Sequence, residues 1–271
     1  MCAMRLLLLL ALIAAARGQT IEFHVIEPSL LEQRLRMAHP KNGERYARLK
    51  ALFEQTGCTD DLYHEQKVSG SKQPNLICQV PGNQGSPRRI VVGAHFDSIG
   101  GDGIVDNWSG AVLLPSLAEF MRRTPRRHNF EFVAFAGEEQ GLLGSKAYVN
   151  AIPKNERPQI AAAITMDSLG LTPTKFWPDG STRELVIDAA VMAQALHLNF
   201  QGVNMGGVAT TDSESFQNAK IPVLSLHSVT RETFGLINNG SDVWKAVSWQ
   251  DYYDTHKLIS GLLVYLDSKL P

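Results

Sequence analysis

The sequence predicts an α/β fold whose central strands are covered on both faces. Three nearly continuous apolar runs of strand length, at residues 90–94, 130–136 and 160–166, lack the polar alternation of a strand with one face in water. Apolar residues at helical spacing follow the first two runs and predict helices at about 111–121 and 142–149. Buried strands that alternate with helices are typical of an open α/β sheet, in which ligands bind at the carboxyl ends of the strands.

Shorter elements precede this centre. Residues 30–53 predict a helix that is broken once around residues 39–43 and ended by Gly57. The extended runs 62–68 and 75–80 are divided by a Ser-Gly-Ser-Lys turn, and they predict edge strands of the sheet.

The last third of the chain predicts two helices and a strand. Ser181-Thr182-Arg183-Glu184 has the pattern of a capping box and predicts the start of a helix that runs to about Leu198. Residues 221–226 predict the last core strand, with His227 at its end, and residues 252–266 predict a closing amphipathic helix.

The composition is that of an ordinary globular chain. The 271 residues are 44% hydrophobic and 20% charged, so one sizeable core in one domain is the expectation. The formal net charge of -1 provides no basic surface for nucleic acid or for an anionic membrane. The composition therefore does not identify a binding partner, which must be inferred from the residues of a candidate functional site.

The amino terminus has the pattern of a secretory signal peptide. A basic Arg5 precedes the apolar run 6–13, and small residues lead to Gly18. We expect residues 1–18 to be removed and residues 19–271 to form the single domain of a secreted or periplasmic protein. The apolar run is shorter than the roughly 20 residues of a membrane span, so no membrane contact is expected after cleavage.

Two cysteines are left in the mature chain after this cleavage. Cys2 would leave with the signal, and Cys58 and Cys78 would remain in a compartment where disulfides persist. The sequence favours a bridge between them over two separately buried thiols.

Each of the three central strands ends in residues that can bind a metal. His95 and Asp97 follow the first strand, Glu138 and Glu139 the second, and Asp167 the third. Each pattern alone has an ordinary explanation, such as a buried structural histidine or two glutamates in a solvated loop. Because the carboxyl ends of such strands meet at one edge, three coincidences are harder to accept than one metal site.

Asp106 lies in a glycine-rich loop, residues 100–110, that leads into the first helix after the strand of His95. A carboxylate on such a loop can approach two metal ions at once. The alternative is that Asp106 only caps the coming helix.

With these residues placed, the sequence resembles metallopeptidase family 28, the co-catalytic zinc aminopeptidases and their glutaminyl cyclase relatives. The segments that carry the resemblance occur in the family's order through most of the chain: Gly93–Ser98, Asp106–Gly110, Phe135–Ser145, Met166–Asp167 and Thr211–Phe216. The resemblance implies a three-layer α/β/α fold with a mixed, mainly parallel central sheet.

The resemblance also implies a role for each strand-end residue. It makes His95 and Asp167 the terminal ligands of one zinc ion and Asp106 the bridge to a second zinc, which Glu139 would bind. Glu138 would be the general base, and Asp97 would stand behind His95. It further implies a cis peptide bond between Asp106 and Asn107.

The sequence departs from the family at one ligand position. The second zinc normally takes a late histidine in a His-x-x-x-Asp pattern, and here Asn238 precedes Asp242 in that place. An amide oxygen is a poorer zinc ligand than an imidazole. His227 or His256 would have to take the place of the missing histidine. Otherwise the protein would bind one zinc ion in place of two.

The leading functional hypothesis is a secreted zinc exopeptidase that removes N-terminal residues from peptides. Glutaminyl-peptide cyclisation and a catalytically silent binding protein are the alternatives. Five aromatic residues are candidates for a substrate pocket, although aromatic side chains in loops are as often plain packing: Trp108, Phe176, Trp177, Phe234 and Trp244.

Overall fold

The computed structural model describes residues 25–83, 85–204 and 210–270. They form one eight-stranded mixed sheet in the order β1-β2-β4-β3-β5-β8-β6-β7. The strands are β1 Tyr63–Gln66, β2 Asn75–Val80, β3 Arg89–His95, β4 Asn129–Phe135, β5 Ile160–Met166, β6 Lys175–Phe176, β7 Gln201–Gly202 and β8 Val223–His227. The four central strands β4, β3, β5 and β8 are parallel, so their carboxyl ends meet at one edge.

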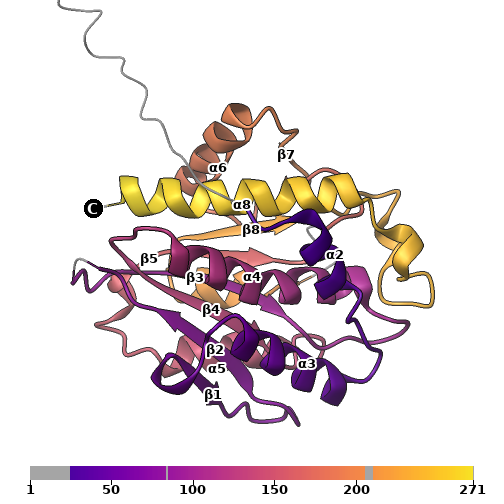
Figure 1. The fold of residues 1–271 in the computed structure, drawn as a ribbon, viewed down its shortest axis with the longest axis horizontal. Helices are drawn as coiled ribbons and strands as arrows, with labels where there is room; N and C mark the ends of the chain where they lie inside the picture. Colours follow the sequence, from indigo (N-terminus) through magenta and orange to yellow (C-terminus); the bar gives the residue numbers. More distant parts are fainter. Residues whose placement is uncertain (1–24, 84, 205–209, 271) are drawn as a thin grey trace, which may run out of the picture.

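Helices cover both faces of this sheet, as the sequence predicts. The helices are α2 Pro28–Leu35, α3 Asn42–Gln55, α4 Ser109–Arg123, α5 Leu143–Ala151, α6 Arg183–Ala195, α7 Ser213–Asn218 and α8 Trp249–Lys269. Figure 1 shows α4 and α8 crossing the near face, with α2 and α3 beside them. The three-layer α/β/α fold is thereby confirmed.

The side chains of β3 alternate between two cores. Ile90 and Val92 belong to the core beneath α4 and α8, whereas Val91 belongs to the core that Tyr148 of α5 and Phe216 of α7 complete. Every one of these strand side chains is apolar because successive residues point to opposite, equally dry faces. This explains the unbroken apolar run.

The disulfide between Cys58 and Cys78 is present, with Cα atoms 5.8 Å apart. It joins the loop after α3 to β2. Among the helices of the described residues, none combines the length and the hydrophobicity that a membrane span requires. The signal peptide expected at residues 1–18 lies outside the described residues.

The structure corrects three details of the sequence prediction. β2 is not an edge strand, because β4 pairs with it on the side away from β1. The capping box does not form: the Ser181 and Thr182 hydroxyls accept hydrogen bonds from the β8 backbone at Ser225 and Val223. The short elements β6, β7 and α7 were not predicted, because two to six residues carry no readable periodicity.

Candidate active site

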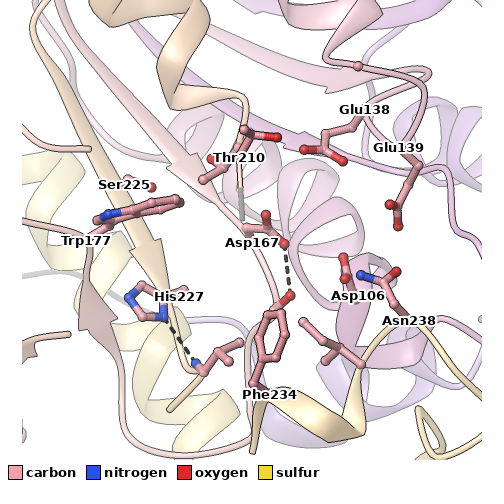
Figure 2. Close-up of a pocket in the computed structure, with 15 residues that line it drawn as sticks. Asp106, Glu138, Glu139, Asp167, Trp177, Thr210, Ser225, His227, Phe234 and Asn238 are labelled. Atoms are coloured by element: carbon pink, nitrogen blue, oxygen red, sulfur yellow. Dashed lines mark hydrogen bonds between the residues drawn. The ribbon is translucent and has the colours of Figure 1, made fainter. Parts of the chain in front are cut away.

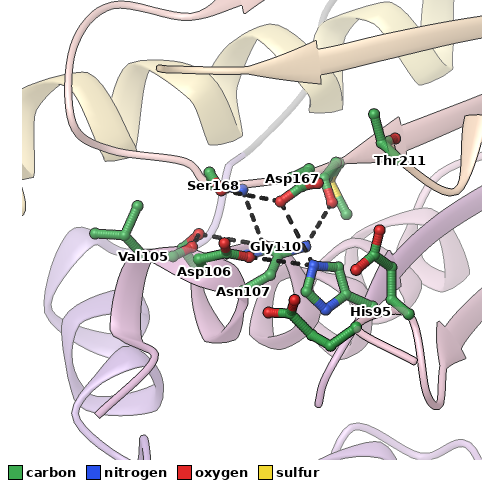
Figure 3. Close-up of polar contacts among 12 residues, drawn as sticks. His95, Val105, Asp106, Asn107, Gly110, Asp167, Ser168 and Thr211 are labelled. Carbon is green, nitrogen blue, oxygen red and sulfur yellow. Dashed lines mark hydrogen bonds and ion pairs between the residues drawn. The ribbon is translucent and has the colours of Figure 1, made fainter. Parts of the chain in front are cut away.

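His95 is the last residue of β3 and is buried. Its Nε2 atom lies 3.2 Å from Oδ1 of Asp106 and 3.5 Å from Oδ1 of Asp167. Its Nδ1 atom lies 3.1 Å from the carbonyl oxygen of Asp97, and in the tautomer protonated at Nδ1 this contact is a hydrogen bond that leaves Nε2 free to bind a metal. Figure 3 shows His95, Asp106 and Asp167 converging.

The carboxylate of Asp97 lies behind His95, and it has a second task as well. It is 3.7 Å from Nδ1 of His95, farther than its own carbonyl oxygen is. Its two oxygens also accept the backbone N–H groups of Glu138, at 3.0 Å, and Glu139, at 3.2 Å. Asp97 therefore fixes the turn that carries both glutamates.

Asp106 lies at a kink in the segment that leads into α4, where its backbone is not helical (φ -110°, ψ 96°), and the peptide bond to Asn107 is cis, as the resemblance implies. The carboxylate of Asp242 accepts the backbone N–H groups of Val105, at 2.7 Å, and Asp106, at 2.9 Å. The capping role belongs to Asn107, whose Oδ1 accepts the N–H of Gly110. Asp106 is thus not the cap of α4, and its side chain faces His95.

Glu138 and Glu139 follow β4 and face a cavity of about 340 Å³ at the carboxyl edge of the sheet. Burial, together with the negative charge of Asp212, raises the pKa of Glu138 to about 9. Burial and the carboxylate of Asp106 raise the pKa of Glu139 to about 8. Oε1 of Glu139 is buried and has no hydrogen-bond partner among the residues that the structure describes.

This cluster has the chemistry of a cation site. His95, Asp106 and Asp167 each offer a ligand atom within 4.8 Å of the others. One imidazole nitrogen with carboxylate oxygens is a donor set that zinc accepts. Burial and the neighbouring carboxylate of Asp167 raise the pKa of Asp106, which indicates crowded carboxylates without a counter-ion, so the first zinc position fits.

The second position has a different donor set. Figure 2 shows the amide of Asn238 beside the carboxylates of Asp106 and Glu139. Asn238 follows the short helix η4, Phe234–Leu236, and has a φ of 60°. Its loop lies so close to Gly100 that a Cβ atom there would be 2.9 Å from the Asn238 carbonyl oxygen. The set holds no nitrogen or sulfur ligand, and it does not fit zinc well.

Neither of the other candidate histidines completes this set. His227 lines the cavity, but its Nδ1 accepts the N–H of Val229 and its Nε2 is 3.2 Å from the Val203 carbonyl oxygen. His256 is fully buried in α8 and is absent from the cavity wall. Burial lowers its pKa to about 3, so it remains neutral.

The cavity that Glu138 and Glu139 face also has apolar residues in its wall. Of the five aromatic candidates, Trp177 and Phe234 line it. Trp108 is instead buried, Phe176 packs on Phe200 and Trp244 stacks on Trp249. The other lining residues outside the metal positions are Gly141, Ser168, Thr210, Thr211, Ser225, His227, Val229 and Ile237.

Sequence reasoning assigned no role to Asp212, although the segment Thr211–Phe216 belongs to the motif that carries the resemblance. Asp212 is buried, and its Oδ1 has no hydrogen-bond partner among the described residues. Burial raises its pKa to about 7, and its charge acts on Glu138. Its position at the edge of the cluster comes from α7, which was too short to predict.

We expect the metal-free protein to lose stability as the pH rises from about 4.5 to about 9. Glu138 and Glu139 titrate near pH 9 and 8 in the folded chain and near 4.5 in the unfolded chain. The folded state therefore binds more protons in this range, and the free energy of unfolding falls as they leave. Urea denaturation at several pH values measures this slope. Zinc should flatten it, and equal slopes with and without zinc would contradict the prediction.

The parallel strand ends and the ligand cluster are the features of a metallopeptidase of the α/β class. A model of peptidase family M28 matches residues 75–262, and the chain belongs to this metallopeptidase family. Leupeptin-inactivating enzyme 1 of Streptomyces exfoliatus is 33% identical over 172 residues, 59% of this chain and 37% of that protein. Aminopeptidase Y of Saccharomyces cerevisiae is 28% identical, over 73% of this chain and 40% of that protein. The chain thus spans well under two thirds of the length of these relatives.

Solved structures share the fold at lower identity. LapA of Legionella pneumophila superposes with a TM-score of 0.78 at 23% identity, covering 90% of this chain and 74% of LapA. A glutaminyl cyclase of Fimbriiglobus ruber superposes with a TM-score of 0.70 at 17% identity, covering 92% of this chain and 99% of the cyclase. At these identities the likeness establishes the fold, and the reaction must be inferred from the site.

Proposed function

We propose that the protein is a zinc-dependent aminopeptidase that hydrolyses N-terminal residues from peptides. The observation that carries this proposal is the placement of Glu138 on the wall of the same cavity as Asp106 and Asp167, which lie beside the buried Nε2 of His95. A base that faces a cation site across an open cavity is the arrangement for metal-assisted hydrolysis.

His95, Asp106 and Asp167 would hold the zinc ion. Zinc bound there would polarise a peptide carbonyl and lower the pKa of a water. A cation would also lower the raised pKa of Glu138 and leave its carboxylate free to accept a proton. Glu138 would take the proton of the attacking water and return it to the leaving amine. Asp97 would hold the Glu138 backbone in place through this transfer.

The cavity favours small peptide substrates with an apolar first side chain. Trp177 and Phe234 stand on its wall opposite the glutamates, as Figure 2 shows, with Val229 and Ile237 also lining it. Apolar walls with a few convergent polar groups are typical of small-molecule sites. The disulfide between Cys58 and Cys78 supports an exported location, secreted or periplasmic.

Glutaminyl cyclisation is the second candidate function, because nearly the full length of the Fimbriiglobus ruber glutaminyl cyclase superposes on this protein. In the relatives that cyclisation site uses the late histidine, and Asn238 replaces it here. A silent binding protein is the third, and the presence of Glu138 argues against it.

Two substrate sets distinguish these functions. The purified protein is treated with a chelator, reloaded with increasing zinc and supplied with aminoacyl anilides or with glutaminyl peptides. The proposal predicts hydrolysis of the anilides that the chelator abolishes and zinc restores. Lactam formation from glutaminyl peptides without anilide hydrolysis would replace it by the cyclase, and neither reaction at any zinc level would favour the binding protein.

A further inference from the structure

The two metal positions that meet at Asp106 differ in their donor atoms. On one side, Nε2 of His95 stands 3.2 Å from Asp106 and 3.5 Å from Asp167. On the other side, Asn238 and Glu139 line the same cavity as Asp106 and offer only oxygen ligands. One position therefore contains an imidazole, and the other contains none.

Apart from His227, the described residues of the cavity wall include no imidazole or thiolate that could serve the second position. Both ring nitrogens of His227 have backbone partners, and Nδ1 of His95 lies against the Asp97 carbonyl oxygen. Cys58 and Cys78 are joined to each other. A second zinc ion would thus have to accept two carboxylates and an amide oxygen.

Oxygen-only sets are typical of hard cations. Mg²⁺ and Mn²⁺ are bound by carboxylate, carbonyl and water oxygens, whereas zinc sites favour nitrogen and sulfur. Three protein oxygens on an open cavity also leave room for the waters that complete an octahedral shell, whereas Ca²⁺ takes six to eight oxygens. The donor number and type favour Mg²⁺ and Mn²⁺.

We propose that the two positions take different ions: zinc beside His95, and a hard divalent cation of the Mg²⁺ and Mn²⁺ class held by Asp106, Glu139 and Asn238. This inference deepens the proposed function and rests on it for the site as a whole. It departs from the zinc pair that the family resemblance implies.

The second position is built by packing on three sides. Asn238 has a φ of 60°, a conformation that asparagine adopts more readily than most residues. Its loop packs on Gly100 and Gly101, where a Cβ atom would lie within 2.9 Å and 2.3 Å of the loop's carbonyl oxygens. The buried Asp242 holds the Asp106 backbone. Because Glu139 Oε1 has no partner among the described residues, a cation would supply the interaction it lacks.

The test uses Mn²⁺ as the probe, because its binding removes the electron paramagnetic resonance signal of the free ion. Metal-free protein is loaded with zinc, dialysed and titrated with Mn²⁺, and both metals are then counted per chain. We expect about one zinc to remain and about one Mn²⁺ to bind beside it. Asn238→Ala should weaken Mn²⁺ binding roughly tenfold or more while zinc is retained.

Asn238→His provides the converse variant. It restores an imidazole at the second position, and histidine also tolerates a positive φ better than most residues. We expect this variant to hold a second zinc ion and to stop binding Mn²⁺. Asn199→His is the matched control, because Asn199 has an exposed side chain and does not line the cavity. It should leave the wild-type metal content unchanged.

Two results would overturn the proposal. In one, the wild-type protein holds two zinc ions that excess Mn²⁺ does not displace. In the other, the zinc-loaded protein binds no Mn²⁺ at all. Anilide hydrolysis, measured on the same samples, tests the proposed aminopeptidase activity separately from the metal content. If the protein holds two zinc ions and hydrolyses anilides, only the proposal of two different metals is refuted. If it holds zinc and Mn²⁺ but does not hydrolyse anilides, only the aminopeptidase proposal is refuted.

Discussion

Glu138→Gln is expected to reduce kcat for aminoacyl anilides by about 10²- to 10⁴-fold, the usual contribution of a general base. Glutamine keeps nearly the shape of Glu138 but cannot take a proton from water at neutral pH. The hydrogen bond to Asp97 survives the change, because it comes from the backbone N–H of residue 138. The turn and the zinc ligands should therefore stay in place.

Metal content and thermal stability distinguish a loss of catalytic activity in Glu138→Gln from a loss of folded structure. We expect zinc binding in Glu138→Gln to be kept, and the melting temperature of the metal-free variant to rise, since a buried carboxylate with a raised pKa is removed. Glu184→Gln, at an exposed position in α6, is the matched control and should have wild-type kcat. Activity in Glu138→Gln within tenfold of the wild type would exclude this base.

The sequence predicts the site's ligands because they stand where readable strands end. The apolar runs of β3, β4 and β5 fix the strand ends to within one or two residues, and parallel pairing then brings His95, Glu138 and Asp167 to one edge. Nothing beyond the local pattern and the geometry of parallel sheets is needed for that step.

What the sequence does not reveal depends on contacts between distant residues. The hydroxyls of Ser181 and Thr182 look like a capping box, yet they bind the backbone of β8 about forty residues later. The walls of the cavity come largely from loops, among them Thr210 and Thr211 just before the short α7, and the positions of these loops depend on packing. Asp212 was overlooked for that reason, since its local sequence does not reveal that its charge meets Glu138.

Asp97 is the clearest example. The resemblance places Asp97 behind His95, and nothing in the local sequence connects its carboxylate to the backbone of the two glutamates. In the fold the Asp97 carbonyl oxygen lies nearer to His95 Nδ1 than the carboxylate does, and the carboxylate binds the backbone of Glu138 and Glu139. The local pattern identifies the residue, and only the tertiary structure assigns its two atoms to different tasks.

Asp97→Ala is therefore expected to weaken zinc binding and the fold together. Without the carboxylate, two buried backbone N–H groups lose their acceptor, at a cost of roughly 1–3 kcal/mol each. Zinc affinity should fall about 10- to 100-fold, because the carboxylate lies behind the zinc ligand His95 and removal of such a supporting group usually has an effect of this size. Competition with a zinc-sensitive dye measures the affinity, and urea denaturation measures the stability.

Asp97→Asn separates the two effects. Its amide oxygen can still accept one of the two N–H groups, but its NH₂ group would face the other, so we expect an intermediate stability. Asp102→Ala, with its exposed side chain in the loop that follows, is the control for removing a nearby negative charge. If Asp97→Ala bound zinc as tightly as Asp102→Ala, the carboxylate would serve the fold alone and would not support His95. The structure leads us to expect the opposite, because this carboxylate lies 3.7 Å from Nδ1 of His95, the imidazole that would bind zinc.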